Sequence, residues 1–525
     1  MAETPALPSL LSYRLSTQDA TFIYGESQSG PLHIGSIALF EGQLDFNAML
    51  GHFDERMHLV PRYRQRLIGV PLNLAHAMME DDPEYSLDNH VHLHQLPDGM
   101  SEADALTEMM RSYQKPLDRK HPLWELHTYH NLTGNRTALL WKVHHCLVDG
   151  VSGVELTKVM YDFRAEPEDI PQPPEPWVPA HPSSQVRRFG EAVRDRIQAA
   201  VSSTINAAVE AIEDPVWVAE RARQVGVASR LMADLATRRI VATPWNATPV
   251  SQDRIVAWTS QPFAEFRAIR SAFGGSVNDV VLAILAESAA RYLQHHGYPV
   301  EGQDLRIGCP VNVRHKEEKT SLGNRVSMMF PTSPAAPMDI VERLKLICEE
   351  TERIKAAGSA QALETLLQLS DAIPPSVIAP AGLAATTLLD VAGRLAKWAD
   401  WKPRPDGFGL PAFGINFVAT NVPGVQVPLY VNGHVCLDMV PLVPLGANLG
   451  YAVAIFSYYR SLYFGMTADP RVMPDVALMK AFVDDAFAEL KRRCVGHSAE
   501  KARHEPPQAR ARRPLEAAPA LDAKS

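Results

Sequence analysis

The sequence predicts an α/β protein built from two domains. The chain has 525 residues, of which 46% are hydrophobic, and this is enough for two separate cores. Apolar runs typical of strands alternate with amphipathic helical patterns from Leu15 to about Phe163, and the alternation resumes near Arg254. We therefore expect a domain over residues 1–165, a proline-rich linker and helical connection over 166–245, a second domain over 246–495 and a disordered tail over 496–525.

Composition narrows the class of function. The formal net charge is -9, so no basic field argues for a nucleic-acid partner. The five cysteines have no metal-ligand or redox spacing, which fits a reducing, cytoplasmic compartment. Met1 to Leu11 lacks the pattern of a signal peptide, and the best candidate for a membrane span, Ala372 to Leu389, is interrupted by prolines. We expect no spanning helix.

The first domain contains a strand-to-helix connection rich in histidine. Ile34 to Phe40 is predicted to be a strand, and Thr137 to Val143 a buried strand. Ser152 and Glu155 have capping-box spacing, which predicts that a helix starts at Ser152. The segment His144-His145-Cys146-Leu147-Val148-Asp149-Gly150 therefore lies at the end of a strand, where side chains are accessible to ligands.

A proline-rich linker separates this domain from a long helix. Residues 166–184 are expected to be extended. A single apolar stripe then predicts a helix that ends before Pro215; it comprises Val193, Ile197, Val201, Ile205, Val209 and Ile212. The stripe either packs on a domain or lies on a membrane surface, and we favour packing.

The second half repeats the alternation. Val277 to Leu293 and Asp339 to Ala357 are predicted to be helices, and a last helix is expected from about Asp475 to Arg493. Strands are predicted over Ile415 to Thr420, Tyr430 to Leu437 and Ala452 to Tyr459.

The two histidines suit acyl transfer from a thioester to an alcohol. A neutral hydroxyl attacks poorly, so a base must remove its proton, and histidine titrates near neutral pH. A thioester is already activated, so no covalent enzyme intermediate is required. Asp149 can fix the loop by pairing with an arginine, for which Arg314 is a candidate, and Gly150 permits a sharp backbone bend.

This segment resembles the His-His-x-x-x-Asp-Gly motif of the coenzyme A-dependent acyltransferase superfamily. That superfamily includes chloramphenicol acetyltransferases, peptide-synthetase condensation domains and plant acyltransferases. Further segments narrow the choice: Pro31-Leu32-His33-Ile34-Gly35, Pro122-Leu123-Trp124-Glu125, Val277-Asn278-Asp279-Val280, Pro310-Val311-Asn312-Val313-Arg314, Leu322-Gly323-Asn324-Arg325 and Asn421-Val422-Pro423-Gly424. Over roughly residues 13–492 the chain resembles the bacterial wax ester synthase/diacylglycerol acyltransferase family.

The resemblance implies two chloramphenicol acetyltransferase-like domains that form a tunnel at their interface. It implies an acyl-coenzyme A substrate, and diacylglycerol or a long-chain alcohol as acceptor, with no metal and no further cofactor. Carried over by position, His145 is the general base, His144 its supporting neighbour and Asp149 a structural residue. Motif residues near the active region, with less defined roles, are Gly150, Pro122, Leu123, Trp124, Asn278 and Asp279. Leu32, Ile34 and Thr420 depart from the commoner family pattern, and these departures bear on the acceptor more than on the reaction.

Three further histidines and Cys146 allow other interpretations. His90, His92 and His94 alternate, so a strand would place all three on one face, where they could hold zinc. No further ligand is evident, and we do not favour a metal. Cys146 could be a nucleophile, but adjacent residues at a strand end point apart, so we expect it to pack.

Two other functions compete with lipid acyl transfer. A condensation-type enzyme acting on carrier-protein thioesters would share His145, and a non-catalytic lipid-droplet protein would be a decayed enzyme. The intact His145 and Asp149 favour the acyltransferase. Because its substrates are lipids, we expect peripheral contact with the inner face of the cell membrane or with lipid droplets, through the helix near Arg187, Arg188, Arg194 and Arg196 rather than through Ala372 to Leu389.

Overall fold

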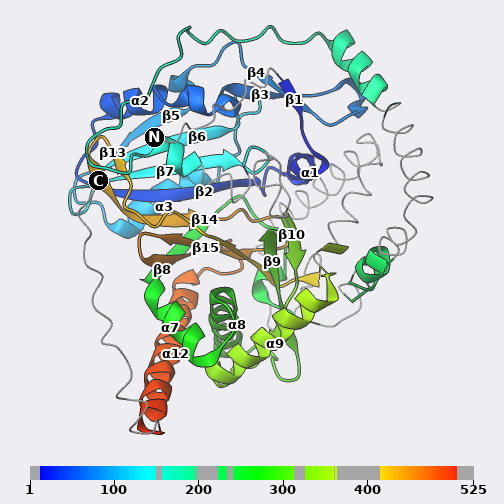
Figure 1. The fold of residues 1–525 in the computed structure, drawn as a ribbon, viewed down its shortest axis with the longest axis vertical. Helices are drawn as coiled ribbons and strands as arrows, with labels where there is room; N and C mark the ends of the chain where they lie inside the picture. Colours follow the sequence, from blue (N-terminus) through cyan, green and yellow to red (C-terminus); the bar gives the residue numbers. More distant parts are fainter. Residues whose placement is uncertain are drawn as a thin grey trace.

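The computed structural model describes residues 12–148, 156–195, 198, 223–231, 233–234, 240–312, 326–359, 361–362 and 414–504. Within these residues two large sheets lie one above the other, and a small third sheet lies beyond the upper one, at the top of the view (Figure 1). Asp149, Gly150, Arg314 and the segment Ala372 to Leu389 lie outside the described residues.

A six-stranded sheet forms the first layer. Its strand order is β13-β14-β2-β7-β6-β5. The bounds are β2 His33–Glu41, β5 Val91–Gln95, β6 Trp124–Leu132, β7 Arg136–His144, β13 Tyr430–Val431 and β14 His434–Leu442. The predicted strands at Ile34 to Phe40 and Thr137 to Val143 are confirmed as β2 and β7. Both are nearly continuous apolar runs because both faces of the sheet are covered.

Short helices and a three-stranded sheet complete the first layer. The helices are α1 Thr17–Gly25, α2 Phe46–Asp54 and α3 Glu102–Tyr113, with one-turn helices η1 Met57–Leu59, η2 Pro61–Arg64, η3 Pro71–Asn73 and η4 Leu87–Asn89. The small sheet has the order β1-β4-β3, with bounds β1 Ser12–Arg14, β3 Gln65–Ile68 and β4 Met78–Asp81. Ser16, Asp45 and Ser101 cap α1, α2 and α3 by accepting a backbone N–H.

A seven-stranded sheet forms the second layer. Its order is β10-β9-β12-β15-β16-β8, and β11 pairs with β9. The bounds are β8 Ile255–Pro262, β9 Asp304–Asn312, β10 Val326–Met329, β11 Thr332–Pro334, β12 Phe417–Val422, β15 Tyr451–Tyr458 and β16 Ser461–Ala468. The short helix η5 Pro244–Asn246 precedes β8.

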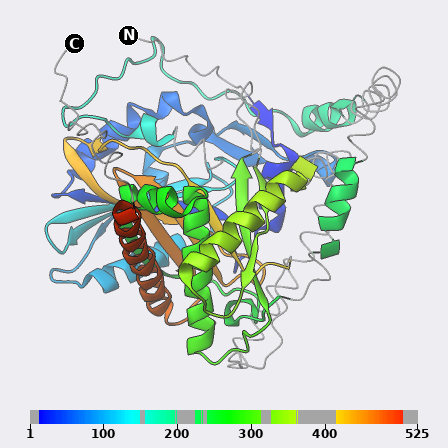
Figure 2. The same ribbon diagram turned by 60° about the horizontal axis from the view of Figure 1, so that its bottom comes forward.

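Four helices pack together beside this sheet: α7 Phe263–Phe273, α8 Val277–His295, α9 Ile340–Ala357 and α12 Val476–His504 (Figure 2). The helices predicted over Val277 to Leu293 and Asp339 to Ala357 are confirmed as α8 and α9. The Ser276–Asp279 capping box fixes the start of α8, and Asp339 caps α9.

The two layers exchange a strand. β14 follows the second-layer strand β12 in the chain, yet it pairs antiparallel with β2 from Gly35 to Phe40. Cys436 and Asp438 of β14 then bond to the second layer, because Tyr458 Oη donates to the Cys436 carbonyl and Tyr463 Oη donates to Asp438. The first sheet therefore draws strands from both sides of the boundary expected near residue 245.

Two of the predicted elements have different bounds in the structure. The strand predicted over Tyr430 to Leu437 is a hairpin, because Asn432 and Gly433 both adopt positive φ, as a tight two-residue turn requires. The last helix does not end near Arg493, and it continues past Gly496 to His504. One glycine in a helix costs only about 1 kcal/mol, so the helix formers that follow it carry α12 on toward Pro506.

The linker and the helix after it lie along the first layer. Residues 166–184 contain no helix or strand, as predicted, and residues 185–195 are helical. The start expected at Ser152 and most of the apolar stripe from Val193 to Ile212 lie outside the described residues. No described helix is alone both long and apolar enough to span a membrane, and α7 with α8 reaches that threshold only as a pair bent by 95°.

Candidate active site

The end of β7 is held between two other segments by its backbone. His144 N–H donates to the Leu123 carbonyl at 2.9 Å, and His145 N–H donates to the Leu32 carbonyl at 3.0 Å. His33 of β2 lies opposite His144 in the antiparallel register. The motifs Pro31-Leu32-His33 and Pro122-Leu123-Trp124, far apart in sequence, therefore fix the two histidines from either side.

His144 is locked inside the protein. Its side chain is 1% exposed, and its Nδ1 accepts the Cys146 N–H at 3.2 Å. Its Nε2 lies 3.4 Å from Glu26 Oε1. Because Nδ1 accepts, Nε2 carries the proton and faces the carboxylate. The His144 side chain is therefore enclosed, between Glu26 and the backbone of its own loop.

Glu26 is a site residue that the sequence analysis missed. Its Oε1 accepts the Leu32 N–H at 3.1 Å, and its Oε2 pairs with Arg119 Nη2 at 2.6 Å. Burial alone would raise the pKa of Glu26, but the nearby His144 N–H and the hydrogen bond and charge of Arg119 lower it to about 2. Glu26 stays ionised and joins the end of α1, the start of β2 and the histidine loop.

His145 is the more accessible of the two histidines. Its ring is half-buried and stacks on Phe22 of α1, with 3.9 Å between ring centroids and 9° between planes. Such stacking fixes the plane of the imidazole while leaving an edge for a second partner. Phe22 lies one turn before Glu26, so α1 contacts both histidines of the pair.

Cys146 packs in the core. It is 2% exposed, and burial raises the pKa of its thiol. A thiol is nucleophilic only as the thiolate, so the packing role expected for Cys146 is confirmed.

The Pro122-Leu123-Trp124 segment acts through structure. All three residues are buried. Trp124 Nε1 donates to the Tyr63 carbonyl at 2.8 Å, and the indole stacks on Tyr63 and on His90. This packing sets the position of the Leu123 carbonyl, which holds His144.

Asn278 and Asp279 stand at the start of α8, in the second layer. Asp279 is buried. Its Oδ2 accepts hydrogen bonds from the N–H and the hydroxyl of Ser276, and its Oδ1 accepts one from Thr351 Oγ1 at 2.8 Å. Asn278 Oδ1 accepts from Asn421 Nδ2 at 3.1 Å, which joins two family segments. Within the described residues, neither Asn278 nor Asp279 bonds to His144 or His145.

The three alternating histidines do not share one face. His90 precedes β5 and its Nδ1 bonds to the Trp124 carbonyl, whereas His92 and His94 face His127 on β6. The expectation that all three share a face is wrong because the strand begins only at Val91. In the described parts of the chain, no group of three or more potential ligands is arranged to hold a metal ion.

The chain resembles known acyltransferases over nearly its whole length. Residues 15–281 match the wax ester synthase/diacylglycerol acyltransferase catalytic domain, and residues 322–491 match the WS/DGAT C-terminal domain. A probable diacylglycerol O-acyltransferase of Mycobacterium tuberculosis (H37Rv) is 30% identical over 486 residues, covering 91% of this chain and 95% of that protein. A second M. tuberculosis protein named as a diacylglycerol O-acyltransferase is 27% identical and covers 91% of this chain and 90% of its own length.

Solved structures show the same fold. A wax ester synthase/diacylglycerol acyltransferase from Marinobacter aquaeolei VT8 superimposes with a TM-score of 0.59 at 22% identity, covering 92% of this chain and 100% of that one. The first condensation domain of the calcium-dependent antibiotic synthetase gives 0.56 at 14% identity, covering 93% and 97%. The predicted two-domain α/β architecture of the chloramphenicol acetyltransferase type is confirmed.

The family models, the relatives and the fold together define an acyltransferase built from two domains. The chain belongs to the wax ester synthase/diacylglycerol acyltransferase family, because the two matching regions and the mycobacterial relatives span nearly all of it.

Replacing Glu26 by glutamine tests its positioning role. Glu26→Gln keeps the shape but removes the charge that holds His144 and Arg119. We expect kcat to fall by roughly 10- to 100-fold with KM changed little, because a misplaced base weakens the chemical step more than binding. Initial rates against acyl-coenzyme A concentration measure the split. Glu84→Gln, at an exposed position, is the control, and unchanged kcat in Glu26→Gln would contradict the role.

The low pKa of Glu26 predicts how stability depends on pH. Because the folded pKa is about 2 and the ordinary value is 4.5, ionised Glu26 stabilises the fold above pH 4.5. That stabilisation is lost as the pH falls toward 2. The melting temperature of the wild type should therefore exceed that of Glu26→Gln at pH 6 by more than at pH 3. A difference that is the same at both pH values would show that the carboxylate charge does not stabilise the fold.

Proposed function

We propose that this acyltransferase moves a long-chain acyl group from acyl-coenzyme A to diacylglycerol, with His145 as general base. A long-chain alcohol is the alternative acceptor, which would give a wax ester. The names of the mycobacterial relatives support diacylglycerol. The observation that carries the proposal is the contrast between the two histidines: His144 is enclosed by Glu26 and Cys146, whereas His145 keeps an accessible ring at the end of β7.

The proposed chemistry needs one proton carrier. His145 removes the proton of the acceptor hydroxyl as the oxygen attacks the thioester carbonyl. The tetrahedral intermediate collapses with loss of the coenzyme A thiolate, which takes the proton back from His145, and the new C–O bond completes the ester. Phe22 fixes the ring plane for both transfers, while Glu26 acts through His144 and the Leu32 backbone. Asp149 is expected to brace the same loop.

Replacing His145 by alanine should abolish transfer and leave the fold intact. Loss of a general base typically lowers the rate by about 100- to 10,000-fold. The assay uses palmitoyl-coenzyme A with either dioleoylglycerol or hexadecanol, and circular dichroism checks the fold. Near-full turnover by the variant would exclude His145 as the base. If the wild-type protein acylates neither acceptor, lipid acyl transfer is excluded, and a reaction with carrier-protein thioesters or a non-catalytic role remains.

We further propose that the protein works at the inner face of the cell membrane or at lipid droplets and docks through the helix over residues 185–195. One face of this helix is anchored, since Ala192 is buried with Val70, Ala75 and Met78. The outer face leaves Val186 82% exposed, Phe189 41% and Val193 36%. Arg187 and Arg194 flank these apolar side chains and are largely exposed. Apolar residues with flanking arginines suit an anionic lipid surface.

The docking helix can be tested without touching the site. Val186→Ser with Phe189→Ser should weaken flotation with anionic liposomes, and Arg187→Glu with Arg194→Glu should weaken it further at low salt. Arg111→Glu, on the exposed side of α3, is the control. Transfer to a dispersed short-chain acceptor should be retained. Equal flotation of all variants would remove this helix as the docking element.

A further inference from the structure

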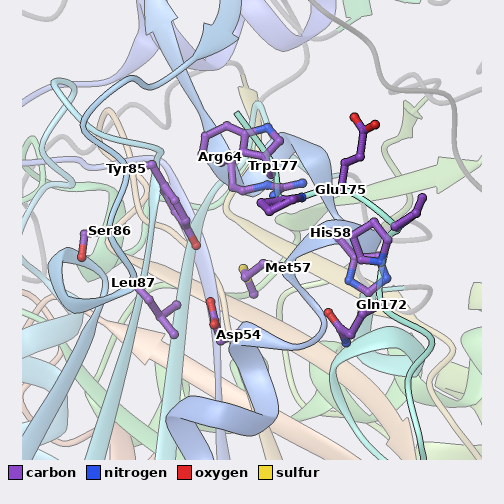
Figure 3. A pocket seen from close by; sticks show the side chains of 13 residues that line it. Asp54, Met57, His58, Arg64, Tyr85, Ser86, Leu87, Gln172, Glu175 and Trp177 are labelled. Carbon is purple, nitrogen blue, oxygen red and sulfur yellow. The ribbon is translucent and has the colours of Figure 1, made fainter. Parts of the chain in front are cut away.

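A cavity lies between the proline-rich linker and the first layer. Its volume is about 590 Å³, within the range typical of sites for small organic ligands. The first layer supplies His58, Arg64, Tyr85 and Leu87, and the linker closes the cavity with residues 172–177 (Figure 3). None of the residues that contact His144 or His145 in the described structure lines this cavity.

Arg64 brings a buried charge to the cavity wall. It is 9% exposed, and its guanidinium lies over the Trp177 ring at 4.4 Å from the centroid. Two other arginines of the first layer are paired with carboxylates, Arg56 with Asp162 and Arg66 with Asp82. Among the described residues, the Arg64 side chain has no ion pair, and its buried Nε has no hydrogen-bond partner. A buried charge without a partner is costly, so Arg64 is suited to receive one from outside.

The charge state of Arg64 agrees with this environment. Burial lowers the pKa of Arg64, and nearby Tyr85, Asp81 and Asp54 oppose that effect. Asp54 and Glu175 are the acidic residues of the lining, and both side chains are exposed, where water and salt screen them. Arg64 therefore remains a cation with fork-shaped donors that fit the two oxygens of a carboxylate or phosphate.

The remaining walls are apolar and aromatic. Tyr85 meets Trp177 edge to face, with 5.9 Å between centroids, and Leu87 and Met57 add aliphatic surface. Figure 3 shows Arg64 beside Trp177 on one wall, with Tyr85 reaching into the cavity from another. The buried Tyr85 Oη and His58 Nδ1 have no hydrogen-bond partner among the described residues. Together these groups offer a flat apolar surface next to unpartnered polar atoms.

We propose that this cavity is a binding site, separate from the histidine site, for a small organic anion: a carboxylate or phosphate monoester on a flat, apolar body. The anionic oxygens pair with Arg64, and the body lies between Trp177, Tyr85 and Leu87. Because Trp177 belongs to the linker, a bound ligand joins the linker to the first layer. The assignment does not depend on which acceptor the enzyme uses.

Calorimetric titration with three ligands that share one aromatic ring system tests the proposal. The probes are 2-naphthoate, 2-naphthyl phosphate and neutral 2-naphthol, added to the full chain. At least one anion should bind, more tightly than 2-naphthol by about tenfold or more, as a charge-assisted pair implies. Whichever anion binds more tightly identifies the head group as carboxylate or phosphate.

Variants locate the binding. Arg64→Met keeps the aliphatic stem and should lose about tenfold or more in affinity for the anion. Trp177→Ala should also lose affinity, while Trp177→Phe, which keeps an aromatic face for Arg64, should retain most of it. Arg111→Met is the matched control, because Arg111 is exposed on α3 and does not line the cavity. His145→Ala should bind the anion as the wild type does.

Three results would overturn the assignment: no binding of either anion by the wild type, equal affinity for 2-naphthol and the anions, or an Arg64→Met variant that is folded by circular dichroism and binds as the wild type does. Should Arg64→Met fail to fold, the comparison of Trp177→Ala with Trp177→Phe decides, and equal binding by those two would contradict the site.

Discussion

The ionised carboxylate of Glu26 is the contact on which the rest of the active site depends. Its two oxygens reach His144, the Leu32 backbone and Arg119, so three segments from separate parts of the chain meet at one buried charge. A buried carboxylate with several donors is tolerated, whereas the same group with one donor removed is costly. The end of β7 is therefore specified by polar pairing as well as by the apolar core beneath it.

Backbone hydrogen bonds also fix the position of the two histidines. Leu123 and Leu32 accept the N–H groups of His144 and His145, so the histidine pair is registered between β6 and β2. His145 is accessible and yet has a fixed ring orientation, since its ring stacks on Phe22. This combination of exposure and fixed geometry suits the general-base role that we propose for His145.

The sequence predicted what is local and periodic. β7, α8 and α9 follow from apolar runs and caps, and the histidine pair follows from its motif. Glu26 could not be found this way, because a lone glutamate after a short helix has no local pattern and its partner His144 is distant in the chain. The pairing of β14 with β2 was missed for the same reason, since a strand pattern does not name its neighbour. The Asn432-Gly433 turn was a different miss, because the dipeptide is itself a hairpin signal.

A double-mutant cycle on kcat tests the central claim most directly, namely that Glu26 acts through His144 to position His145. The variants are Glu26→Gln, His144→Gln and the double replacement, each checked for folding by circular dichroism. If the two side chains work as one unit, the double variant loses no more activity than the worse single variant. Losses that multiply would show that Glu26 and His144 act independently, and would contradict the account.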